Sequence, residues 1–301
     1  MPSSGFLSLT WSDLAHALFV TGRAPGGEAT YPRLALYEWL HRVTIVPAYL
    51  SERDGRVRRT ELADLLDRSE KVNLSYALGQ AGTGVFCSQR LGVTRLMHVD
   101  RYASAHNLSF GPTRRRPDLF GSSPTGWVVA EAKGRSSNVD AQLPVTLQKQ
   151  KGAIRTIGGL APAVALGCII FFGTRQGEMQ ILAVDPPLDE EGVDLDVDLE
   201  RFLYAYYDAF VAAIGPGQPS IRDDVEYVMA QDLPGALALG LRRSIVDAVV
   251  QARRSGERRL VVDGGNLTEA MLGGPHGDGT VVELVLDAGS DLGERGQGSL
   301  R

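Results

Sequence analysis

The chain has 301 residues, of which 44% are hydrophobic, and its formal net charge is -5 at neutral pH. This composition can fill the core of one large domain or two modest ones, and it excludes a globally disordered chain. The sequence contains no apolar run of membrane-spanning length, no leader-like N-terminal segment and no zinc-type Cys/His spacing, so we expect a cytoplasmic protein with buried free thiols at Cys87 and Cys168.

The first predicted region, residues 1–70, combines helices with extended chain. Apolar side chains recur at helical spacing over 32–42, which predicts a helix whose stripe faces the core. Residues 43–50 are expected to be extended, and the Asp54-Gly55 pair predicts a tight turn.

Residues 60–78 leave an alternative function open. Thr60 can cap a helix over 61–68, and a second amphipathic segment follows after a short break. Two amphipathic helices separated by a short break are typical of a helix-turn-helix, in which the second helix lies in a DNA groove. The second helix has few Arg or Lys side chains that could contact bases.

The second predicted region, residues 71–190, begins with a long helix over 71–92. Its glycines are expected to permit close helix packing, because the sequence lacks the Gly-Lys-Ser/Thr of a phosphate-binding loop. A strand over 93–99 should follow, in which His98 has a structural role. Asp100 is expected to be exposed, as part of an ordinary surface pair with its neighbours Arg101-Tyr102.

A predicted hairpin brings two carboxylates together. Asp118 follows Pro117, a turn-forming segment spans 121–126, and an apolar strand leads to Glu131-Ala132-Lys133. Because alternate side chains of a strand share one face, Glu131 and Lys133 should point to the same side. The return of the chain could place Asp118 beside Glu131.

Two carboxylates and a lysine in this arrangement suit a hard metal ion. Mg²⁺ and Mn²⁺ prefer oxygen ligands and also bind substrate phosphate. Such an ion activates a bound water, and a nearby ammonium stabilises developing negative charge. The alternative is a surface hairpin with a solvent-facing Glu131–Lys133 pair.

A polar helix and two strands are predicted after the hairpin. The helix should begin at Pro144 and end at Gly158-Gly159. Gln148, Lys151 and Arg155 would share one of its faces. The apolar run over 164–172 predicts a strand buried on both sides, and another strand should span 179–184.

The third predicted region, residues 191–301, is mainly helical with a strand pair and a frayed tail. The aromatic segment over 201–214 predicts a helix whose rings pack in the core, with base stacking as the alternative. Residues 233–254 are expected to be mostly helical, and strands are expected over 260–263 and 281–287.

The hairpin resembles the active-site motif of the PD-(D/E)xK nuclease superfamily. Pro117-Asp118 matches the first half of the motif and Glu131-Ala132-Lys133 matches the second, over roughly residues 71–190. The resemblance implies an α/β restriction-endonuclease-like fold, in which helices flank a mixed central sheet. The N- and C-terminal α/β regions would be additions to this fold.

The resemblance also implies a role for each candidate residue. Asp118 and Glu131 would hold Mg²⁺ or Mn²⁺, and Lys133 would orient the attacking water. Either Glu70 or Gln80 would complete the site. Gln148 and Lys151 would support the site, with a solvated helix face as the alternative. Local charge, rather than the resemblance, suggests contacts to the nucleic-acid backbone from Arg155 and from the run Arg114, Arg115 and Arg116, for which a solvated charge run is the alternative.

The function that follows from the resemblance is metal-dependent hydrolysis of phosphodiester bonds. DNA is expected in preference to RNA, and a role in bacterial defence, such as restriction, extends the same resemblance. The acidic net charge is unusual for a dedicated nucleic-acid binder. Two alternatives remain: a DNA-binding regulator that uses residues 60–78, and an interaction protein with a nuclease-like fold that does not cut. A homo-oligomer or a partner protein is compatible with each.

Overall fold

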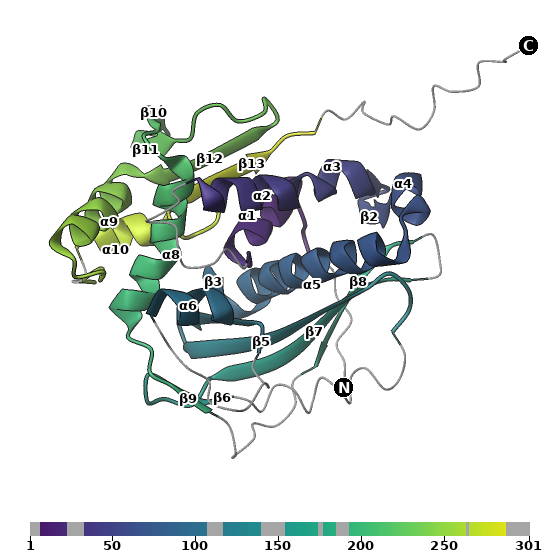
Figure 1. Cartoon of the computed structure of the whole chain (residues 1–301), viewed down its shortest axis with the longest axis horizontal. Helices are drawn as coiled ribbons and strands as arrows, with labels where there is room; N and C mark the ends of the chain where they lie inside the picture. Colours follow the sequence, from purple (N-terminus) through teal and green to yellow (C-terminus); the bar gives the residue numbers. More distant parts are fainter. Residues whose placement is uncertain are drawn as a thin grey trace, which may run out of the picture.

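The computed structural model describes residues 7–22, 33–106, 117–139, 154–173, 177–184, 193–262 and 265–286. The protein is a mixed α/β structure (Figure 1). A five-stranded sheet is covered by the long helix α5, and the N-terminal helices lie between α5 and a second, four-stranded sheet. The predicted α/β class is therefore confirmed.

The five-stranded sheet has the strand order β3-β4-β5-β7-β8. Strands β3, β4 and β5 form an antiparallel meander, β7 is parallel to β5, and β8 is antiparallel to β7. A parallel neighbour requires the chain to cross from one end of the sheet to the other. The strand bounds are Arg95–His98, Leu119–Ser123, Gly126–Arg135, Val164–Phe172 and Met179–Val184.

Helix α5 (Arg68–Leu91) packs on β5 and β7 at very short range. Asp67 and Glu70 form a capping box at its start, and Gly92 ends it in the left-handed conformation. A Cβ atom added to Gly79 would lie 2.6 Å from the backbone nitrogen of Gly134 in β5. The glycines therefore serve close packing, as the sequence predicted.

Helix α1 (Trp11–Val20) connects the two sheets, because it packs against both α5 and β13. Helix α2 (Leu34–Val43) buries the predicted apolar stripe, and Thr60 caps α4 (Glu61–Leu65) as expected. The predicted extended stretch over 43–50 is wrong, because Ile45–Tyr49 forms helix α3. Its β-branched residues favour strands, but Val46 is fully buried and tertiary packing prevails. The Asp54-Gly55 turn joins β1 (Leu50–Arg53) to β2 (Arg56–Arg59).

The predicted helix that ends at Gly158-Gly159 is wrong over its described part. Ile154–Ile157 forms strand β6, which pairs in parallel with β9 (Val193–Leu195). Ile154 and Ile157 are both buried, and β-branched side chains suit a strand. Residues 140–153 lie outside the described part of the chain.

The C-terminal region contains more strand than its sequence predicted. Helix α8 (Leu199–Ile214) buries its aromatic rings, which confirms the core interpretation of that segment. Residues 233–254 divide into strand β12 and helix α9, and Leu260 to Val262 do not form a strand. The remaining elements are α6 (Val99–His106), β10 (Gln218–Arg222), β11 (Val225–Met229), β12 (Leu237–Arg242), α9 (Arg243–Ser255), α10 (Asn266–Leu272) and β13 (Thr280–Leu284).

One hydrophobic core joins the three predicted regions. It contains Leu14 and Trp39 from the first region, Leu78 and Phe120 from the second, and Phe202 from the third. The thiols of Cys87 and Cys168 are free and buried, as predicted.

We predict that replacing Gly134 with alanine strongly destabilises the fold. The added Cβ would overlap the carbonyl oxygen of Ser75 in α5, and backbone atoms cannot yield as a flexible side chain can. The free energy of unfolding should fall by about 2–4 kcal/mol in urea titrations. Gly235→Ala is the control, because its exposed turn offers nothing within 4 Å of the new atom. Equal unfolding midpoints for the two variants would contradict the close contact.

Candidate active site

The β4–β5 hairpin positions the two predicted carboxylates. In the register Leu119 faces Ala130, so Asp118 lies one residue beyond the paired strands, beside Glu131 and Ala132. The carboxylate Oδ2 of Asp118 accepts a hydrogen bond of 3.0 Å from the backbone N–H of Ala132. The backbone carbonyl oxygen of Asp118 accepts a second hydrogen bond, of 2.9 Å, from the backbone N–H of Val99. The aspartate is thus fixed between the end of β3 and the middle of β5.

Glu131 lies inside the protein, with only 3% of its surface exposed. Its Oε1 accepts a hydrogen bond of 2.5 Å from Nζ of Lys133, so the two side chains share a face of β5 as predicted. Its other oxygen, Oε2, is buried and has no hydrogen-bond partner. A buried carboxylate oxygen without a partner is costly for a fold, so this atom marks a place where a ligand would be stabilising.

The two carboxylates disfavour each other's charge. Burial raises the pKa of Glu131 to about 7; the charge of Asp118 adds to this shift, and Lys133 opposes it. Burial also raises the pKa of Asp118, whereas the Ala132 N–H and Lys133 lower it. The pair therefore retains protons at pH values where exposed carboxyl groups are ionised. A cation would relieve the same repulsion.

Asp100 is a third acidic group near the pair, and the predicted exposed surface pair with Arg101-Tyr102 is wrong. It lies in the first turn of α6, and its charge raises the pKa of Asp118. Its backbone N–H donates to Nδ1 of the buried His98 at 3.1 Å, and its neighbours Arg101 and Tyr102 are buried rather than exposed. Its position directly after a predicted strand was the available signal.

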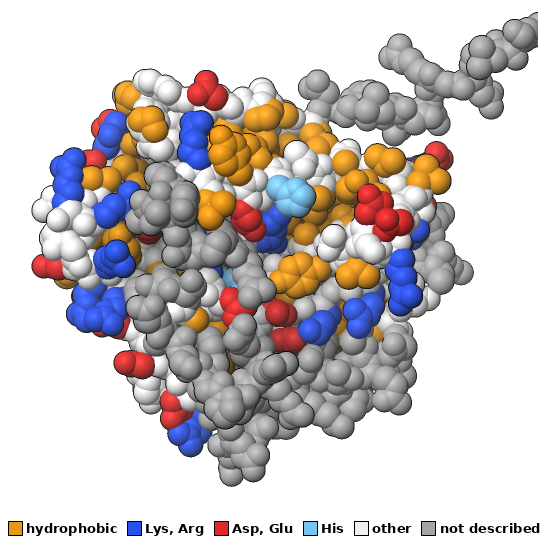
Figure 2. Space-filling view, in the orientation of Figure 1, with side chains coloured by type: hydrophobic (Ala, Val, Ile, Leu, Met, Phe, Trp, Pro, Cys, Tyr) orange, Lys and Arg blue, Asp and Glu red, His pale blue; other side chains and the backbone are white. Residues whose placement is uncertain are grey.

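Gln80 and Glu70 occupy different environments. Glu70 is exposed, and its carboxylate accepts a hydrogen bond from the N–H of Asp67 in the capping box of α5. Gln80 is fully buried and belongs to a cluster of polar side chains between α2 and α5. Of the two candidates for completing the site, the structure thus assigns Glu70 to helix capping. In the view of Figure 2, acidic, basic and apolar side chains are intermixed over the region where Figure 1 labels the N-terminal helices and α5.

The remaining candidates do not join the carboxylates in the described structure. Arg155 lies on β6 rather than on a helix, and it forms an exposed ion pair with Asp194 of the neighbouring β9. The other predicted side chains, Gln148, Lys151, Arg114, Arg115 and Arg116, lie outside the described residues.

Residues 60–78 do not form two comparable exposed helices. Helix α4 has only five residues, whereas the second helix continues to Leu91 and buries much of its length on the sheet. A recognition helix needs an accessible face for a DNA groove. The packing of α5 therefore weighs against the helix-turn-helix alternative.

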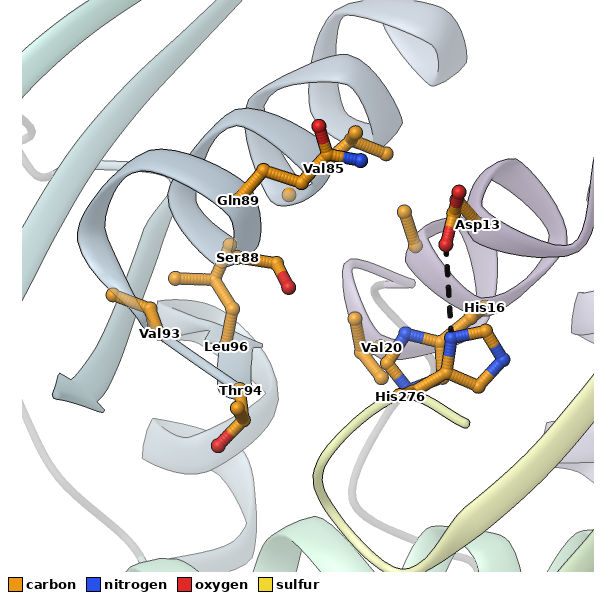
Figure 3. A pocket seen from close by; sticks show the side chains of 12 residues that line it. Asp13, His16, Val20, Val85, Ser88, Gln89, Val93, Thr94, Leu96 and His276 are labelled. Carbon is orange, nitrogen blue, oxygen red and sulfur yellow. Dashed lines mark ion pairs between the residues drawn. The ribbon is translucent and has the colours of Figure 1, made fainter. Parts of the chain in front are cut away.

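A separate small pocket lies between α1, the C-terminal end of α5 and the loop that precedes β13 (Figure 3). The rings of His16 and His276 stack there, with centroids 4.1 Å apart. His16 contacts the buried Asp278 at 2.9 Å, and Nε2 of His276 lies 3.0 Å from the carbonyl oxygen of Val282. Burial lowers the pKa of His276 to about 4. The cavity volume is about 30 Å³, which is too small for a nucleotide. The contacts of His16 with Asp278 and His276 connect α1 to the segment before β13.

Comparisons of the chain with protein-family models, curated proteins and solved structures found no match. Among the described residues, no helix combines the length and apolarity needed to cross a membrane.

We predict that the buried carboxyl of Glu131 makes stability depend on pH. Its pKa in the folded protein, about 7, exceeds its ordinary value of 4.5, so the stabilisation by the bound proton is complete below pH 4.5 and is lost as the pH rises through 7. In EDTA, the free energy of unfolding of the wild type should therefore fall relative to Glu131→Gln by about 2–3 kcal/mol between pH 4.5 and pH 8. Urea titrations at both pH values measure this difference.

The control for this measurement is Glu226→Gln, which changes an exposed glutamate on β11. The free energy of unfolding of this control should change with pH as that of the wild type does. If the free energy of unfolding of Glu131→Gln also shows the same pH dependence as the wild type, Glu131 does not hold a proton in the folded protein.

Proposed function

We propose that the protein is a metal-dependent nuclease that hydrolyses phosphodiester bonds. The observation that carries the proposal is the pair formed by the half-buried Asp118 and the buried Glu131, with Lys133 bound to one oxygen of Glu131 and the other oxygen of Glu131 left without a hydrogen bond. A structural ion pair would satisfy its buried atoms within the protein. A site for a cation satisfies them only when the cation binds.

The donor set fits Mg²⁺ or Mn²⁺. These ions prefer carboxylate oxygens and are often held by one or two carboxylates, with water and substrate phosphate completing their coordination. Within the described ranges, no three His, Cys, Asp or Glu side chains are grouped closely enough to hold a metal by themselves. Two carboxylates and bound substrate are therefore the arrangement that this site supports, with Asp118 and Glu131 as the protein ligands.

Lys133 is the group that would act on the substrate. Its side chain is 27% exposed, so its ammonium is accessible from solvent while it contacts Glu131. In this position it orients the attacking water and stabilises negative charge that develops on the phosphoryl group. The metal, when bound, would lower the pKa of that water and neutralise phosphate charge. Asp100 would add negative charge beside Asp118 and so favour the cation.

The order of elements supports the restriction-endonuclease-like fold that the motif resemblance implies. Helix α5 precedes an antiparallel meander of three strands, and the fourth strand, β7, is parallel to the third. Asp118 lies directly before the second strand of the meander, β4, and Glu131 lies on the third strand, β5, in the order that the motif resemblance implies. The preference for DNA and the role in defence against foreign DNA come from the resemblance alone.

We predict that cleavage requires a divalent cation and each of the three side chains. Asp118→Asn and Glu131→Gln should each reduce the rate of metal-dependent cleavage of plasmid, linear DNA or RNA by at least about 100-fold, because each change removes a charged metal ligand. Lys133→Ala should reduce cutting to a similar extent yet retain the metal affinity measured by calorimetry. Assays with Mg²⁺, Mn²⁺ and EDTA test the requirement for metal.

Glu226→Gln is again the control and should cut as the wild type does, because this exposed glutamate lies on β11 of the second sheet, where it forms an ion pair with Arg243 of α9. Cutting by the wild type in EDTA, or full activity of Glu131→Gln, would refute the mechanism. A wild type that binds no metal and cuts no substrate would instead support the interaction-protein alternative.

A further inference from the structure

The face of β5 that carries the carboxylate site continues past Lys133 to the end of the strand. Alternate side chains share a face, so Glu131, Lys133 and Arg135 form one row. This row lies on the side of the sheet away from α5 (Figure 1), because the intervening residues pack against that helix. The pairing of β5 with β7 continues through Arg135 without a register shift. The strand therefore places Arg135 roughly 7 Å beyond Lys133 on the same face.

Exposure to solvent increases along this row. Glu131 is buried, the side chain of Lys133 is 27% exposed, and Arg135 at the end of the strand is exposed. The row thus leads from the buried carboxylate to the surface of the protein. Its exposed end is a direction from which a long polyanion can reach Lys133, and such a chain then passes over Arg135.

The guanidinium of Arg135 is available for a ligand. Its Nη1 donates a hydrogen bond of 3.0 Å to the backbone carbonyl oxygen of Gly134, its neighbour in the strand. Within the described ranges it forms no ion pair with a carboxylate. A guanidinium group presents several N–H donors in a planar fork, which matches the oxygens of a phosphate. The bond to Gly134 leaves donors of this fork for a phosphate.

The neighbouring strands place no acidic side chain opposite the two cations of the row. The register partners of Lys133 and Arg135 on β7 and β8 are apolar or amide side chains, namely Ile169, Phe171, Gln180 and Leu182. The apolar members of this set pack together. A cation beside apolar side chains attracts an anion more strongly than a cation among carboxylates, because no neighbouring charge offsets it.

We infer that Arg135 binds the phosphate next to the one that is cleaved, so that the substrate is a polynucleotide with a phosphate on that side of the cut. This inference rests on the proposed nuclease function, which assigns the cleaved phosphate to Lys133. Neighbouring phosphates of an extended strand are separated by a distance similar to that between these two residues along β5. The guanidinium fork of Arg135 binds two oxygens of the flanking phosphate, whereas the ammonium of Lys133 acts as a point charge.

The first test measures binding apart from cleavage. The full chain in EDTA is titrated with labelled DNA and RNA oligonucleotides at several salt concentrations. Arg135→Ala should weaken binding about tenfold and reduce the slope of log affinity against log salt by roughly 0.7–0.9, because one phosphate contact is lost. Arg135→Lys retains the charge and should keep the slope of the wild type. A structural role of Arg135 does not change the number of phosphate contacts, so an unchanged slope for Arg135→Ala would overturn the inference.

Arg254→Ala is the matched control, because Arg254 is an exposed arginine in the last turn of α9, which packs against α8 and the second sheet. It should bind with the affinity and the salt slope of the wild type. Equal losses for Arg254→Ala and Arg135→Ala would show a general dependence on surface charge and would overturn the contact assigned to Arg135.

The second test identifies the phosphate. In an oligonucleotide that the wild type cuts, the cut is mapped, and the phosphate on each side of it is replaced in turn by an uncharged methylphosphonate. Arg135→Ala should lower kcat/KM on the unmodified oligonucleotide about tenfold. One of the methylphosphonates should slow the wild type to a similar extent and cause no further loss in Arg135→Ala, because the contact is already missing. Losses that add in full at both positions would overturn the inference.

The outcomes also separate this inference from the proposed function. If no protein cuts with any metal while Arg135→Ala reduces the salt slope, the nuclease proposal fails and the phosphate contact stands. If metal-dependent cutting needs Glu131 but Arg135→Ala binds and cuts as the wild type does, the phosphate contact fails and the nuclease proposal stands. A wild type that neither binds nor cuts nucleic acid would overturn both.

Discussion

Helix α5 packs on strand β5 backbone against backbone, and the placement of the neighbouring elements follows from this contact. Gly79 and Gly134 let the helix backbone meet the strand backbone without an intervening side chain. This close approach fixes the height of α5 above the sheet. It consequently determines where α1, which packs on α5, can place the second sheet.

The carboxylate pair is costly because Glu131 is buried, and burial is the largest cause of its raised pKa. Its side chain extends from the face of β5 opposite to Gly134, which faces α5. Lys133 compensates for only one oxygen of this side chain. The fold thus tolerates an unfavourable charge arrangement at one place while its core is otherwise well buried. Unfavourable electrostatics of this kind are characteristic of functional sites, where a bound ligand supplies the missing interaction.

Local signals predicted the hairpin and its side-chain geometry, whereas contacts between distant segments could not be predicted. The turn formers and the alternation of side chains placed Glu131 and Lys133 on one face, and the contact between them agrees with this placement. Asp100 was placed on the surface because its proximity to Asp118 depends on the pairing of β3 with β4. The strand at Ile154–Ile157 was missed for a similar reason, since its partner lies about forty residues away in β9.

The hydrogen bonds of Gln80 give the exposed ring of Tyr76 a fixed orientation. A glutamine inside a helix facing the core needs partners for both its amide groups. Here one partner is a buried arginine and the other is the hydroxyl of Tyr76. The buried charge and the exposed ring are therefore linked through one amide, and neither can reorient without breaking a buried hydrogen bond.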